Sequence, residues 1–74
     1  MNNYYFSYGI GSTTQPFRGG YSLIKANDIH EAINKHTAKH GLNAGLVRCA
    51  FWYDEEEFNK YFKKEMMVCH ETID

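Results

Sequence analysis

Two aromatic-rich runs flank a long glycine-containing connection, and this feature constrains the fold of the chain most strongly. The connection occupies residues 8–21, whereas a tight hairpin needs only two turn residues. The flanking runs 3–8 and 21–26 predict two paired strands, because aromatic residues favour strands. The connection is then either a plain surface loop or a pocket lined by backbone. Its glycines are Gly9, Gly11, Gly19 and Gly20.

Two later stretches carry the start signals of helices. Asp28 is followed by Glu31 and Asp54 by Glu57, each at the three-residue spacing of a capping box. Gly41 supplies the left-handed stop of the first helix. The side chains expected to be buried on the second helix are Phe58, Tyr61 and Phe62.

The remaining apolar runs complete the predicted topology. Residues 45–53 form a nearly continuous apolar run that predicts a central strand, and 66–73 predict a closing strand. The order is therefore β-β-α-β-α-β. This is the α+β class: a single small domain over residues 1–74, with the helices packed on one face of a mostly antiparallel sheet.

Charge and hydropathy exclude several kinds of partner. Eight Lys and Arg face nine Asp and Glu, a formal net charge of −1, so binding to a nucleic-acid duplex is not expected. No apolar run approaches the roughly 20 residues of a membrane span, and the start of the chain does not resemble a signal peptide. Cys49 and Cys69 then fit reduced thiols, and we expect a cytoplasmic protein that contacts no membrane.

The aromatic content suggests an interface. Aromatics make up 16% of 74 residues, more than so small a domain easily buries. If these side chains remain exposed, the area of their apolar patch exceeds what monomers usually expose. We therefore expect a homo-oligomer, held partly by the first hairpin. The side chains concerned are Tyr4, Tyr5, Tyr8, Phe17 and Tyr21.

The glycine-rich connection is a candidate anion site. Backbone N–H groups freed by glycine can surround an anion, and hydroxyl and guanidinium groups add donors. Neither standard nucleotide fingerprint is present, because both require a helix directly after the glycines. The alternative, a hairpin loop whose glycines only relieve backbone strain, stays open. The candidate ligand-binding residues are Tyr8, Gly9, Gly11, Ser12, Thr13, Arg18, Gly19, Gly20 and Arg48.

Histidines and thiols offer a second kind of chemistry. His36 and His40 lie four residues apart on one helix face, a spacing that can hold one metal ion. Cys49, Cys69 and His70 could complete a zinc site, but paired Cys-x-x-Cys ligands are absent. A histidine on a buried stripe is usually hydrogen-bonded there, so we expect no metal and no cofactor.

Catalysis is not expected from the segment "CHE". Adjacent strand residues point to opposite faces, so Cys69 and His70 cannot form a dyad, whereas Cys69 and Glu71 share a face. A thiol enzyme needs a positioned base and an oxyanion site as well. The chain therefore predicts a binding protein and not an enzyme.

Four segments and two alanines, in order, resemble a family of short, functionally obscure proteins encoded by phages and mobile elements of Gram-positive gut bacteria. The resemblance rests on "YYFSYG" at 4–9, "PFRGGY" at 16–21, Ala26 and Ala32, "AFWYDEEEF" at 50–58 and "CHETI" at 69–73. It implies an accessory protein and supplies no catalytic residues.

Small proteins of this type often act by stoichiometric binding against host immunity. We therefore expect capture of a small phosphate-bearing nucleotide at the glycine-rich loop, inside a bacterial host cell. The alternative is an inhibitor that docks on a host defence protein such as a CRISPR effector. A structural module without a ligand is a further alternative.

Overall fold

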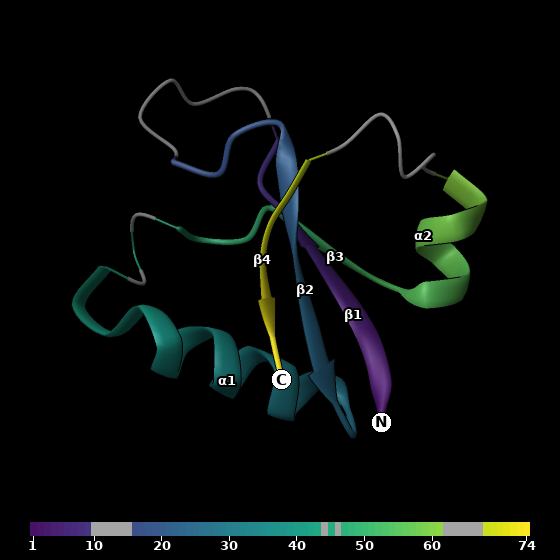
Figure 1. The fold of residues 1–74 in the computed structure, drawn as a ribbon, viewed down its shortest axis with the longest axis horizontal. Helices are drawn as coiled ribbons and strands as arrows, with labels where there is room; N and C mark the ends of the chain where they lie inside the picture. Colours follow the sequence, from purple (N-terminus) through teal and green to yellow (C-terminus); the bar gives the residue numbers. More distant parts are fainter. Residues whose placement is uncertain (10–15, 44, 46, 62–67) are drawn as a thin grey trace.

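The strands form one four-stranded mixed sheet in the order β3-β1-β2-β4 (Figure 1). The computed structural model describes residues 1–9, 16–43, 45, 47–61 and 68–74. Strand β1 pairs antiparallel with β2 and β3, and β2 pairs parallel with β4. The elements are β1 (Asn2–Ser7), β2 (Gly20–Ala26), α1 (Ile29–His40), the 3-10 turn η1 (Gly41–Asn43), β3 (Phe51–Asp54), α2 (Glu55–Tyr61) and β4 (Val68–Ile73).

The α+β class and the β-β-α-β-α-β order agree with the sequence prediction, but the helices do not share one face. Helix α1 and helix α2 lie on opposite sides of the sheet (Figure 1). The reason is strand alternation, because successive side chains point to opposite faces. In β1 both sets are aromatic and buried: Tyr4 and Phe6 face α1, and Tyr5 faces α2. Each face therefore needs its own helix.

The predicted N-caps of both helices are confirmed, although at α1 the N–H that donates to Glu31 Oε1 is that of Asn27 and not of Asp28. The Glu31 N–H donates to Asp28 Oδ1 at 2.8 Å, and Gly41 ends α1 at a φ of 53°. At α2 the Glu57 N–H donates to Asp54 Oδ1 at 2.7 Å, and the Asp54 N–H donates back to Glu57 at 3.3 Å. These bonds satisfy N–H groups that a helix start leaves unpaired.

Two predictions about the second half of the chain are wrong. The apolar run 45–53 does not form a central strand: strand structure begins only at Phe51, and β3 lies at the sheet edge. Tyr61 is 63% exposed, because the seven-residue α2 buries only Phe58. Phe62 and the start of the predicted strand at 66–67 lie outside the described residues.

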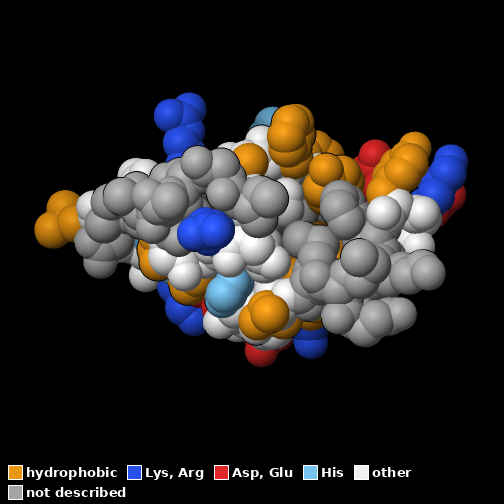
Figure 2. Space-filling model, turned by 90° about the horizontal axis from the view of Figure 1, so that it is seen from above, with side chains coloured by type: hydrophobic (Ala, Val, Ile, Leu, Met, Phe, Trp, Pro, Cys, Tyr) orange, Lys and Arg blue, Asp and Glu red, His pale blue; other side chains and the backbone are white. Residues whose placement is uncertain are grey.

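The aromatic side chains expected to form an interface are mostly core. Tyr4, Tyr5, Tyr8 and Tyr21 are buried within one chain, so they do not supply the expected exposed patch. Among the described residues, the exposed aromatics are Phe51, Trp52 and Tyr61 instead. On the face drawn in Figure 2, hydrophobic side chains reach the surface in several groups beside charged ones.

Neither described helix has the length and apolar character that crossing a membrane requires.

Candidate functional site

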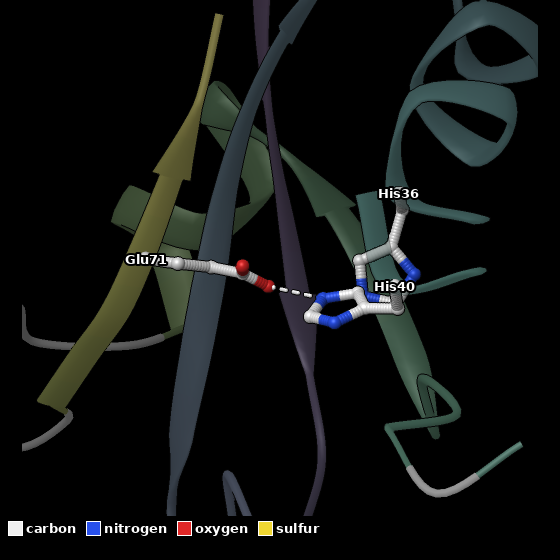
Figure 3. Close-up of side chains that lie close together, drawn as sticks. All are labelled: His36, His40 and Glu71. Atoms are coloured by element: carbon white, nitrogen blue, oxygen red, sulfur yellow. Dashed lines mark hydrogen bonds and ion pairs between the residues drawn. The ribbon is translucent and has the colours of Figure 1, made fainter. Parts of the chain in front are cut away.

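A chain of polar side chains lies between α1 and the sheet. The Tyr8 hydroxyl is 2.6 Å from Ser22 Oγ and 2.7 Å from His36 Nε2. Ser22 Oγ donates to Glu71 Oε2 at 2.6 Å, and His40 Nε2 lies 2.8 Å from the same oxygen. Figure 3 shows the Glu71 carboxylate directed toward His40, with His36 beside it.

Counting the available protons shows which atom donates in each hydrogen bond of this network. The Ser22 hydroxyl has one proton and gives it to Glu71, so the Tyr8 hydroxyl donates to Ser22. Tyr8 then accepts from His36 Nε2–H, which places the lone pair of neutral His36 on its other ring nitrogen. Five residues from four separate segments of the sequence thus form one ordered network.

Helix α1 and an irregularity of β4 position this network. His36 and His40 share a helix face because they are four residues apart. The register between β2 and β4 shifts by one residue: Tyr21 pairs with Cys69, but the next residue, Ser22, pairs with Glu71. His70 is the extra residue of this β-bulge, and the bulge directs Glu71 toward α1.

The bulge overturns the expectation that Cys69 and Glu71 share a face. Cys69 lies beside Tyr21, whose ring packs on the α2 side with Phe58. Glu71 instead joins Ser22 and the α1 histidines. The two side chains are therefore separated by the sheet.

Burial and hydrogen bonding shift three pKa values in the network. Burial alone would raise the pKa of Glu71, but hydrogen bonds from Ser22 and His40, with Lys39 nearby, outweigh it and lower that pKa. Burial, with His40 adjacent, lowers the pKa of His36. Burial raises the pKa of Tyr8. At neutral pH, Glu71 is ionised, and His36 and Tyr8 are uncharged.

We expect the free energy of unfolding to fall on acidification. His36 and Glu71 both have lower pKa values folded than unfolded, so the unfolded chain binds more protons at acid pH. The stabilisation is complete above the ordinary histidine pKa of 6.5, and it declines below that pH. The Glu71 contribution is lost later, below the ordinary carboxyl pKa of 4.5.

Urea denaturation in steps from about pH 8 to pH 4 measures this decline. Glu71→Gln should remove the lower step and leave the histidine step in place. A free energy of unfolding that stays constant from about pH 8 to pH 5 would contradict the assignment to His36.

A groove of about 420 Å³ lies beside the network, between α1 and the chain segment that leads into β3. Phe6, His36 and Thr37 line one part, and Arg48 and Trp52 line another. Trp52 is 45% exposed and pairs across the strands with Phe6, which places it on the α1 face. The volume lies within the roughly 300–1,000 Å³ of small-molecule sites.

A second hollow, of about 460 Å³, has a different electrostatic character. It lies near the start of the chain, and its charged side chains are Asp54, Glu55 and Glu56. Neither lysine nor arginine is among the described residues that line it. An anionic ligand therefore fits the groove with Arg48 and not this hollow.

Cys49 lies in the groove but does not resemble a nucleophile. Its thiol donates to the carbonyl of Phe51 at 3.0 Å, and burial raises its pKa to about 11. The reactive thiolate is thus scarce at neutral pH. This favours a binding groove over a thiol active site.

The described part of the glycine-rich connection shows why several glycines stand there. Gly9 and Gly19 have φ values of 69° and 78°, which favour glycine. The Gly19 N–H donates to the Gly9 carbonyl at 2.8 Å, and the Gly20 N–H donates to Phe17 at 3.1 Å. Both N–H groups therefore donate to carbonyls within the same connection.

The predicted ligand-binding residues do not all come together. Tyr8 lies in the buried network, Arg48 lines the groove, and Arg18 is exposed in the turn before β2. Neither Arg18 nor the described loop glycines line the groove. Gly11, Ser12 and Thr13 lie outside the described residues.

The histidine pair converges on a carboxylate and not on a thiol. The donor atoms of His36, His40 and Glu71 all lie within 4.8 Å of one another. No cysteine belongs to this cluster in the described part of the chain. Sequence reasoning missed Glu71 as the partner of His40, because only the bulge brings Glu71 there, and it missed Ser22, which links Tyr8 to Glu71. Trp52 was also missed, although its position after Arg48 in an apolar run was visible.

No family model, curated protein or solved structure matches the chain.

Proposed function

We propose that the protein binds a small phosphate-bearing ligand with an aromatic base, such as a nucleotide, in the groove beside α1. The observation that carries this is the presence of Arg48 and the half-exposed Trp52 on one groove of about 420 Å³. A guanidinium suits phosphate because it offers paired donors. An exposed aromatic ring suits a base because stacking contributes roughly 1–3 kcal/mol per base.

The binding is stoichiometric in this proposal. The groove contains Cys49 with a raised pKa and no arrangement of nucleophile and base among its described residues. The resemblance to phage and mobile-element proteins suggests a purpose for such capture: removal of a nucleotide signal of host defence inside a bacterial cell. The ligand class is the one expected from sequence, but the proposed binding site is the groove and not the glycine-rich loop.

Calorimetric titration with AMP, cyclic AMP and a cyclic dinucleotide tests the proposal, with inorganic phosphate as the comparison. Arg48→Ala should weaken binding by roughly ten- to a hundredfold, since a charge-assisted hydrogen bond contributes roughly 1.5–3 kcal/mol. Trp52→Ala should weaken binding roughly tenfold, and Trp52→Phe should retain most of it.

Arg18→Ala is the matched control, because Arg18 is also an exposed arginine but lies in the glycine-rich turn. Unchanged affinity in this variant supports the groove. Loss of affinity in Arg18→Ala with normal binding in Arg48→Ala would place the site at the loop. Absence of binding by all of these nucleotides would reject the nucleotide class.

A second candidate function is docking on a host protein, and the exposed edge strand favours it. Among the described strands β3 pairs only with β1, and its Phe51 side chain is 69% exposed. Edge strands with exposed apolar side chains can pair with another chain. The partner would be a host defence protein such as a CRISPR effector, or a second copy in a homo-oligomer. Phe51→Lys should abolish capture of that partner in a pull-down; because Phe51 also lines the groove, nucleotide affinity is not a control for this variant.

A further inference from the structure

The two histidines of α1 and the bulged carboxylate of β4 have the composition of a metal site. His36, His40 and Glu71 bring their donor atoms within 4.8 Å of one another from two elements (Figure 3). We propose that these three residues bind one divalent transition-metal ion of the zinc class. The proposal does not depend on nucleotide binding, since it uses the buried network and not Arg48 or Trp52.

The spacing on α1 favours a shared ion. Residues four apart on a helix lie on one face, one turn from each other, so their imidazoles can approach one centre. The rings of His36 and His40 have centroids 4.8 Å apart at an angle of 62°. His36 is buried, and the His40 side chain is only 12% exposed. The helix thus holds two imidazole nitrogen donors side by side, largely shielded from solvent.

The third donor is held from the other side of the same space. The Glu71 side chain is 9% exposed, and Ser22 Oγ donates to its Oε2 at 2.6 Å. Tyr8 holds one ring nitrogen of His36 at 2.7 Å. Metal ligands in proteins are typically oriented by such outer hydrogen bonds, which fix the ring and the carboxylate. Ser22 and Tyr8 would serve as these orienting residues.

The donor set selects the class of ion. Two imidazoles and one carboxylate suit zinc, cobalt, nickel or ferrous iron, whereas magnesium and calcium prefer oxygen ligands throughout. Two histidines and one glutamate also form one of the known three-residue zinc sets. From the sequence no metal was expected here, and Glu71 was not included as a ligand, since it reaches the histidines only through the β4 bulge.

The present distances require the donor atoms to move, since they lie within 4.8 Å of one another and a bound ion would bring the farthest of them closer. Zn–N and Zn–O bonds of about 2.0–2.1 Å place tetrahedral ligand atoms roughly 3.3 Å apart. His40 Nε2 and Glu71 Oε2 are 2.8 Å apart, so the ion would replace the hydrogen bond between them. Lys39 Nζ, 3.8 Å from Glu71 Oε1, has a 49% exposed side chain that can turn to solvent. Binding should therefore release a proton or shift it to the other ring nitrogen of His40.

The rival explanation is a self-sufficient hydrogen-bond network. Every buried side-chain polar atom among the described residues already has a partner. The experiment must therefore separate a site that holds an ion from one that only stabilises the fold.

Cobalt and zinc serve as the probes. Untagged protein, stripped with a chelator and desalted, is titrated with Co²⁺ and followed by visible absorption, and Zn²⁺ is then added in competition. The expected result is one Co²⁺ per chain with the visible bands of a four- or five-coordinate site, displaced by one Zn²⁺. In the wild-type protein, NMR should show zinc shifting the ring signals of His36 and His40 and leaving those of His30.

Three variants assign the ion to this cluster. Glu71→Gln keeps the shape of the side chain but removes a charged ligand, so it should weaken binding by at least about a hundredfold, the upper end of the range for losing a residue that only orients a ligand. His30→Ala changes an exposed histidine of the same helix, and Cys69→Ser removes an exposed thiol; both should bind normally. Binding weaker than about 1 mM in the wild type overturns the proposal. So does equal binding by Glu71→Gln, or loss of binding in either control.

Discussion

Replacing Phe58 with alanine is expected to lower the free energy of unfolding by about 3–5 kcal/mol. Phe58 is fully buried, and its ring stacks on Tyr5 with centroids 4.0 Å apart and contacts Tyr21 at 4.9 Å. In the described part of the chain, these three are the buried residues of the core on the α2 face. A domain of this length has a total stability on the order of 4–11 kcal/mol, so the variant should be largely unfolded at moderate temperature.

Urea denaturation followed by circular dichroism measures this effect. Tyr61→Ala is the matched control, because Tyr61 lies on the same helix and is 63% exposed. It should change the free energy of unfolding by no more than about 0.5 kcal/mol. A loss below about 1 kcal/mol in Phe58→Ala would mean that α2 does not stabilise the sheet.

The opposite placement of the helices was not predictable from local signals. The capping residues Asp28 and Asp54 identify where each helix begins, because their hydrogen bonds are made within three residues. Which face a helix covers depends on which strand face lacks a partner. Aromatic residues at every position of 4–6 leave both faces of β1 apolar, so the pattern alone does not select one.

The position of each strand within the sheet was likewise not predictable from local sequence. An apolar run such as 45–53 suggests burial on both faces, and hence a central strand. In the folded chain β1 and β2 occupy the centre, because the first hairpin supplies two long strands with two apolar faces. The strand after α1 is then only four residues long and lies at the edge.

The candidate site was predicted in part. The histidine spacing on α1 and the choice of Arg48 came from the sequence, since both depend on residue type and short-range geometry. Glu71 required the β4 bulge, a one-residue irregularity that reverses the facing of a strand. Tyr8 was selected as a ligand-binding residue of the loop, and its hydroxyl lies inside the network, bonded to Ser22 and His36.

Gly20 is the glycine whose replacement should disturb both the fold and the site. A Cβ added at Gly20 would meet the His70 ring and the carbonyl oxygen of Val68. The ring is the end of a side chain and can turn away, but the carbonyl belongs to β4, which pairs with β2 at this point. Gly20→Ala must therefore push the two strands apart where the bulge begins.

We expect Gly20→Ala to lower the free energy of unfolding by about 1–3 kcal/mol, the usual cost of overpacking. Gly45→Ala is the matched control, because nothing lies within 4 Å of its added Cβ and its φ is not in the left-handed region. It should be neutral or should raise the free energy of unfolding by up to about 1 kcal/mol, because alanine lowers the conformational entropy of the unfolded chain.

The double variant Gly20→Ala with His70→Ala separates the two contacts. If the ring were the main obstacle, its removal would restore the lost stability. Because the Val68 carbonyl remains, we expect most of the loss to persist, measured by urea denaturation as the midpoint of unfolding. The displaced bulge should also move Glu71 away from His40, so the ring signals of His40 in NMR spectra should change in Gly20→Ala and not in Gly45→Ala. Full rescue by His70→Ala, with unchanged His40 signals, would show that Gly20 accommodates a side chain and does not set the position of the bulge.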